Sequence, residues 1–157
     1  MAGPGLTLSE TFAERAAEFT RGARLQADRG DPAAQGHILQ SLCVGLELAF
    51  KAFLLARGRS DDWNRREIRH DLAKAAKAAT ELGLPAPAPA VTRLIETVGP
   101  AYARHRLGEL PALDIGLPEA VRLVDDQLTA IYAARLTVSS PSTPPVRRRR
   151  PRSRRPS

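Results

Sequence analysis

The stretch that decides the fold is residues 36–58, GHILQSLCVGLELAFKAFLLARG. Its apolar residues recur at intervals of three and four, which places them on one wide face of an α-helix. They are Ile38, Leu39, Leu42, Cys43, Leu46, Phe50, Phe53 and Leu54. Asp31-Pro32 supplies a start signal, and Gly58 supplies a stop signal after Arg57. The pattern predicts a central core helix between these two signals.

Helical signals of the same kind lie on both sides of this core helix. Before it, Thr7 and Glu10 have the spacing of a capping box and open an amphipathic run that ends near Gly30. After it, the apolar spacing predicts three further helices, at residues 70–82, 91–106 and 118–136.

Two segments are expected to interrupt the helices. Residues 59–69 are polar apart from Trp63 and predict a loop or a short irregular turn. Gly99-Pro100 is expected to break or kink the helix at residues 91–106, because proline lacks a backbone N–H. Five helical segments with mostly short connections predict an all-α fold, an up-and-down helical bundle of four to five helices.

Composition and charge divide the chain into two parts. The 157 residues suit one domain, and residues 138–157 are rich in proline, serine and arginine without any acid. Such a segment has little to bury, so we expect a helical domain at residues 1–137 and a disordered tail at residues 138–157. The tail holds seven of the 24 basic residues, which leaves 17 in the body, equal to the 17 acidic residues. The high pI therefore belongs to the tail, and the body is neutral overall.

Several classes of protein are disfavoured by the residues present. Cys43 is the only cysteine and lies in an apolar stretch, so we expect a buried thiol and no internal disulfide. The N-terminus lacks the pattern of a secretory signal, and the most apolar segment, residues 42–55, is shorter than the roughly 20 residues that span a bilayer. We expect a soluble, cytoplasmic chain that binds no membrane. One cysteine and scattered histidines predict no metal site, and no phosphate loop or dinucleotide fingerprint indicates a cofactor.

Three pieces of sequence follow one another in a specific order. The core helix carries Gly45-Leu46-Glu47-Leu48, Lys51 and Leu54-Leu55, the next helix opens with His70-Asp71-Leu72, and a later segment carries Tyr102, Arg104 and Arg106. Over residues 33–133 this order resembles a prokaryotic branch of the HEPN superfamily (higher eukaryotes and prokaryotes nucleotide-binding). Two positions depart from the resemblance. Arg69 stands where a glycine is common, and His105 stands where relatives often have another residue.

The resemblance implies a homodimer of HEPN-like bundles that works as a non-catalytic binding module for a nucleotide or RNA. It also implies a possible nucleotidyltransferase-type protein partner and a defence or toxin–antitoxin setting. The expected ligand-binding residues are Glu47, Lys51, His70, Asp71, Tyr102, Arg104 and Arg106. A purely structural interpretation stays open for each piece. Glu47 and Lys51 have the spacing of a helical ion pair, His70-Asp71 suits a helix cap that contacts Glu47, and the arginines suit a solvated helix end.

An alternative function is metal-independent RNA cleavage. Active HEPN ribonucleases carry an arginine and a histidine separated by four to six intervening residues, presented by two subunits at a dimer interface. Arg65 and His70 have four intervening residues and fit that spacing. In this hypothesis His70 transfers the proton of the 2′-hydroxyl and Arg65 stabilises charge on the phosphate.

A second alternative assigns nucleic-acid binding to the tail. In that hypothesis the helical domain only dimerises and delivers the tail to nucleic acid, because arginine forms bidentate contacts with phosphate. An anionic surface or a purely solubilising role stays open for the same segment. The tail arginines are Arg147, Arg148, Arg149, Arg150, Arg152, Arg154 and Arg155.

Overall fold

A computed structural model describes residues 5–137, and every regular element within them is a helix, which confirms the all-α class. The α-helices are α1 (Leu8–Asp28), α2 (Gln35–Ala56), α3 (Asp61–Trp63), α4 (Leu72–Glu81), α5 (Pro89–Ala103) and α6 (Leu117–Leu136). Three short turns of other helical types connect them: η1 (Pro32–Ala34), η2 (Asn64–Ile68) and η3 (Leu107–Glu109). The predicted tail lies outside the described residues.

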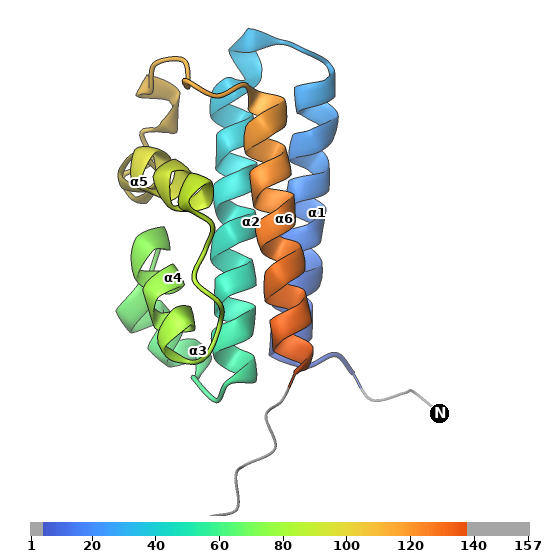
Figure 1. Cartoon of the computed structure of the whole chain (residues 1–157), viewed down its shortest axis with the longest axis vertical. Helices are drawn as coiled ribbons and strands as arrows, with labels where there is room; N and C mark the ends of the chain where they lie inside the picture. The colour runs from blue at the N-terminus through green and yellow to red at the C-terminus, as the bar shows by residue number, and fades with distance from the viewer. Residues whose placement is uncertain (1–4, 138–157) are drawn as a thin grey trace, which may run out of the picture.

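Three long helices lie side by side along the length of the molecule (Figure 1). Helix α1 runs antiparallel to α2, whereas α6 runs in the same direction as α2. The shorter helices α4 and α5 cover another side of α2, and α5 lies crosswise to the long helices (Figure 1). The arrangement is a helical bundle, but a strict up-and-down order holds only for its first two helices.

Helix α2 is the central helix, as its wide apolar face predicts. Its apolar side chains from Ile38 to Leu54 are almost all buried, and they contact helices from both sides of the bundle. The stretch Pro32–Ala56 is long and apolar enough to cross a membrane, yet 72% of its apolar 18-residue window is buried inside the bundle, as in the core helix of a soluble protein.

Helices α1 and α2 pack in close contact because of one glycine. A Cβ atom on Gly45 would lie 2.7 Å from Cγ2 of Thr20 and 3.4 Å from the Ala16 carbonyl oxygen. The hydroxyl of Ser9 also crosses this interface and donates to the Ala52 carbonyl at 2.7 Å. Gly45 therefore sets the spacing of the two helices.

The helix signals at the N-terminal half of the chain are confirmed with one shift. Thr7 and Glu10 form a complete capping box at the start of α1. Asp31 caps as predicted, accepting from the Ala33 N–H at 2.9 Å, but the element it opens is η1 rather than α2 itself. Helix α2 begins at Gln35, after that turn.

Residues 59–69, predicted as a loop or a short irregular turn, are mostly helical, since α3 and the π-helix η2 occupy most of the segment. The Ser60 hydroxyl accepts from the Trp63 N–H at 3.0 Å and starts the helical path. Ile68, at the end of η2, is buried in the core. A capping side chain at the start of the segment and a buried apolar side chain at its end therefore help to order a polar sequence.

The predicted break at Gly99-Pro100 is also absent, since α5 continues through Pro100 to Ala103. The helix ends at Ala103, earlier than predicted, and His105 just after it is left-handed, with φ of 56°. Two hydrogen bonds close this end: His105 N–H donates to the Tyr102 carbonyl at 3.1 Å and Arg106 N–H to the Ala101 carbonyl at 2.8 Å. This pair of bonds is a Schellman motif, in which glycine usually occupies the left-handed position.

Candidate functional site

The centre of the site is a buried carboxylate, Glu47, on the edge of the core face of α2. Its Oε1 accepts from Lys51 Nζ at 2.7 Å, one helical turn further along. Its Oε2 lies 2.9 Å from His70 Nδ1 and accepts from the Tyr102 hydroxyl. Glu47 and Lys51 are each only 8% exposed and Tyr102 is 4% exposed. Three donors from three parts of the chain therefore satisfy one buried charge, which is the condition under which such a charge is tolerated.

The network sets the ionisation states of its members. Burial raises the pKa of Glu47, but the hydrogen bonds from Lys51, Tyr102 and His70 outweigh burial and hold this pKa below its usual value. Burial, and then the Glu47 charge, raise the pKa of the Tyr102 hydroxyl well above its usual range. The neighbouring Cys43 is buried, as predicted, and burial followed by the charge of Glu47 raises the pKa of its thiol to about 12. At neutral pH Glu47 is therefore ionised, while Tyr102 and Cys43 keep their protons.

Lys51 links this network to the turn that carries His70. Its Nζ donates a second hydrogen bond, at 2.8 Å, to the Arg69 carbonyl oxygen. Arg69 has φ of 54° and ψ of −114°, and Asp71 N–H donates to the Ile68 carbonyl across it at 3.0 Å. These are the dihedrals of the first central residue of a type II′ turn, a position that favours glycine. The Lys51 contact thus holds the carbonyl of a strained residue next to His70.

His70 is presented to solvent by this turn. Its side chain is 52% exposed, and Nδ1 faces Glu47, which leaves Nε2 as the nitrogen available to an external group. Its ring centroid lies 5.9 Å from that of Tyr102 and 5.9 Å from that of His105. A buried carboxylate that fixes one imidazole nitrogen also fixes the direction of the other.

Arg104, His105 and Arg106 form the exposed turn at the end of α5. We call the set Arg69, His70, Arg104, His105 and Arg106 the basic face. None of the ion pairs among residues 5–137 involves Arg69, Arg104 or Arg106. Their guanidinium groups are therefore free to contact an anion.

The structure brings together some of the residues predicted from the sequence and separates others. Glu47, Lys51, His70 and Tyr102 form one network, in which three members are buried and only His70 reaches solvent. Asp71 caps α4, where its carboxylate accepts from the Lys74 N–H at 2.9 Å. The binding roles predicted for these residues stay predictions, with the buried members in a position to support rather than touch a ligand.

Arg65 lies apart from this network. Its guanidinium pairs with Asp61 at 2.9 Å, one turn earlier, and is 77% exposed. Among the contacts of residues 5–137, none joins Arg65 to His70.

Arg69 and His105 were not among the ligand-binding residues predicted from the sequence. Both stood out as departures from the resemblance, and both have positive φ. That departure was the available signal, because a residue other than glycine at a left-handed position is a local strain that surrounding contacts must hold.

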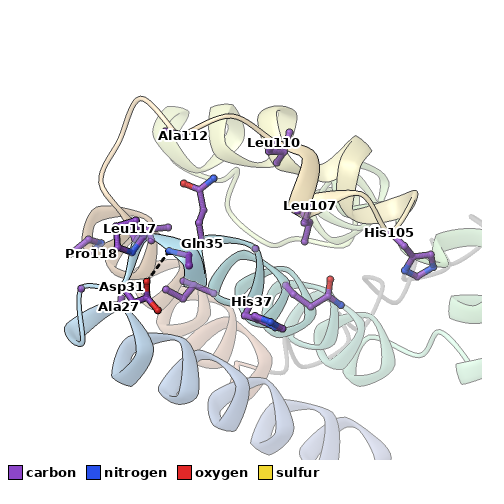
Figure 2. A pocket seen from close by; sticks show the side chains of 17 residues that line it. Ala27, Asp31, Gln35, His37, His105, Leu107, Leu110, Ala112, Leu117 and Pro118 are labelled. Atoms are coloured by element: carbon purple, nitrogen blue, oxygen red, sulfur yellow. Dashed lines mark hydrogen bonds between the residues drawn. The ribbon is translucent and has the colours of Figure 1, made fainter.

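Two surface cavities are lined by histidines of the basic face, and a third, of about 280 Å³, is lined by Arg104, Arg106 and Glu109. One, of about 500 Å³, lies beside His70 and includes Arg66, Arg69 and Lys74. The other, of about 1010 Å³, has His105 at one edge and the start of α6 at the opposite edge (Figure 2). Within residues 5–137, no group of three His, Cys, Asp or Glu side chains is arranged to hold a metal ion.

In comparisons with known proteins, no family model, no curated protein and no solved structure matches this chain. The likeness to the HEPN superfamily therefore rests on the motif residues alone and remains a resemblance.

Proposed function

We propose that this chain is a non-catalytic binding module of HEPN type, which recognises the phosphates of a nucleotide or of RNA at its basic face. The observation that carries the proposal is the approach of two imidazoles from separate turns, His70 and His105. Arginines that form no ion pair among residues 5–137 adjoin both histidines in the sequence. The arginines carry positive charge that attracts an anion such as phosphate.

The chemistry of the basic face suits phosphate. Arginine offers paired N–H donors that match two phosphate oxygens, and an imidazole adds one further donor. The network around Glu47 orients His70 before a ligand arrives, so that binding requires little reorganisation. Contacts of this type bind phosphate without reading sequence.

The contact of His70 with Glu47 within one subunit supports the binding module. Cleavage would need the Arg65 guanidinium of one subunit beside the phosphate that His70 of another attends, and the exposed pair of Arg65 with Asp61 is too weak to oppose that alternative. Homodimerisation, a nucleotidyltransferase-type partner and a defence or toxin–antitoxin role stay predictions that follow from the resemblance.

The test is fluorescence anisotropy with a labelled single-stranded RNA of about twelve nucleotides, a length that fits a single binding domain. The protein is the full chain with its seven tail arginines replaced by serine, so that the tail does not mask the domain. Replacing both Arg104 and Arg106 with glutamine should weaken binding by at least about tenfold and reduce the salt slope by about 1 to 2.

The matched control replaces Arg15 and Arg21, two exposed arginines of α1, with glutamine. The control removes the same charge from another surface, so it should change the affinity much less. Equal losses in the two double variants would show that only net charge matters and would refute the basic face. If replacing the tail arginines with serine is enough to abolish RNA binding, the result would support the tail-delivery alternative. If the protein cleaves RNA without metal, and Arg65→Gln abolishes this cleavage, the result would support the ribonuclease alternative.

A further inference from the structure

The larger of the two cavities lies between parts of the chain that are distant in sequence. Its walls come from the end of α1, η1, the first turns of α2, η3 and the start of α6 (Figure 2). Its volume of about 1010 Å³ is at the upper end of the range for small-molecule sites, which is roughly 300–1,000 Å³.

The cavity combines an apolar floor with polar side chains at its rim. Ile38 and Leu107 are buried and lie at its base, with Leu110 and Leu117 partly buried beside them. At the rim, no hydrogen bond to another residue within 5–137 involves the side chain of His37. Gln40, which also lines the cavity, is exposed. An apolar floor with free amide and imidazole groups suits a flat heteroaromatic ring that carries donors and acceptors on its edge.

One residue belongs both to this cavity and to the basic face. His105 lines the cavity, and its ring also lies 5.9 Å from that of His70. A ligand whose phosphate contacts the two histidines therefore has its neighbouring groups at the mouth of the cavity. In single-stranded RNA the group next to each phosphate is a nucleoside whose base is free to turn outward.

We infer that this cavity takes unpaired nucleobases of the RNA strand whose phosphates the basic face binds. The inference rests on the proposed function and adds a base subsite to it. The basic face supplies affinity that is independent of sequence, and the cavity distinguishes a strand with accessible bases from other polyanions.

A glycine at the cavity wall provides the probe. Gly108 lines the cavity, and a Cβ atom on it meets no atom within 4 Å, so a larger side chain is accommodated at the cavity wall without a clash. Gly22, on the exposed side of α1, is equally unhindered and does not line the cavity. Gly108→Leu and Gly22→Leu therefore form a matched pair, in which only the first should obstruct a base.

The experiment compares two ligands of equal length and charge in the full chain with serine in place of the tail arginines. One is single-stranded RNA of about twelve nucleotides, and the other is the same ribose-phosphate chain without bases. RNA should bind about tenfold more tightly than the abasic chain, since one stacked base contributes about that factor. Gly108→Leu should remove this difference and leave the affinity for the abasic chain unchanged, whereas Gly22→Leu should leave both affinities unchanged.

Each other result has a defined meaning. Equal affinities for RNA and the abasic chain, or RNA binding that Gly108→Leu leaves intact, overturn the base subsite and leave the phosphate site standing. No binding of either ligand overturns the proposed function as well. If thermal melting shows that Gly108→Leu is unfolded, His37→Ala decides the question. It should weaken the binding of RNA alone, and an unchanged RNA affinity in that variant overturns the inference.

Discussion

The left-handed backbone positions of this chain fall into two groups, and the contrast between them locates the site. Helices α2 and α4 end in Schellman motifs with glycine at the left-handed position, Gly58 with φ of 95° and Gly83 with φ of 104°. Helix α5 ends in the same pattern of hydrogen bonds with His105 there instead. Within residues 5–137, the only other residue with positive φ that is not glycine is Arg69.

The two strained residues lie on either side of His70, whereas the glycines lie elsewhere. A side chain at a left-handed position costs about 1–2 kcal/mol, which glycine avoids. The strained backbone at Arg69 places its carbonyl where Lys51 donates to it, and the strained backbone at His105 places its imidazole beside His70. Helices α2 and α4 therefore end at glycine, without strain, whereas side chains at positive φ occur where the basic face is formed.

The largest expected effect comes from removing the charge that holds the strained side together. Glu47→Ala leaves Lys51 as a buried cation without its carboxylate, so the free energy of unfolding should fall by about 3–5 kcal/mol. Urea denaturation followed by circular dichroism measures this. Glu14→Ala, on the exposed surface of α1, is the control and should change the stability by less than about 0.5 kcal/mol. A similarly small change at Glu47 would mean that the network does not stabilise the turn.

The next effect introduces strain where the chain has none. Gly83→His places a histidine at the left-handed position after α4, where α5 has His105. A Cβ atom at residue 83 meets no atom within 4 Å. Only the backbone conformation opposes the change, so the stability should fall by about 1–2 kcal/mol while RNA affinity is unchanged. Thermal melting and anisotropy on the same samples measure both. An unchanged melting temperature would remove the energetic basis of the comparison.

The reverse changes should stabilise the protein and weaken its binding. Arg69→Gly and His105→Gly each relieve a left-handed side chain and should raise the free energy of unfolding by about 0.5–1 kcal/mol. Each also removes one phosphate donor, so the RNA affinity should fall by up to about tenfold. A variant that gains stability and keeps its full affinity would separate the strain from the function.

The smallest effect concerns acid. The pKa of Glu47 is lower in the folded protein than its usual value of 4.5, so the unfolded chain binds a proton more readily. The contribution of Glu47 to stability is therefore complete above about pH 4.5 and is lost as the pH falls through its folded pKa. Urea denaturation between neutral pH and about pH 3 should show the wild-type and Glu47→Gln stabilities converging in acid. Parallel curves would show that Glu47 is not the group that titrates.

The features that the sequence predicts correctly are those that depend on contacts between near neighbours along the chain. The apolar spacing predicts α2 at the centre of the bundle, and the spacing of Thr7 and Glu10 predicts the capping box. The four-residue spacing of Glu47 and Lys51 places the two charges together, as observed. Each of these rests on hydrogen bonds or side-chain contacts within one helical turn, which a local pattern specifies.

Which distant groups meet depends on the packing of the helices. The turn at Arg69 and the end of α5 are brought together because α4 and α5 pack against α2, and no local pattern encodes the 5.9 Å between His70 and His105. The π-helix over a polar segment follows from the burial of Ile68, and the orientation of Arg65 follows from that helix. Left-handed strain at residues other than glycine runs against local preference, so it persists only because long-range contacts, such as Lys51 on the Arg69 carbonyl, hold it in place.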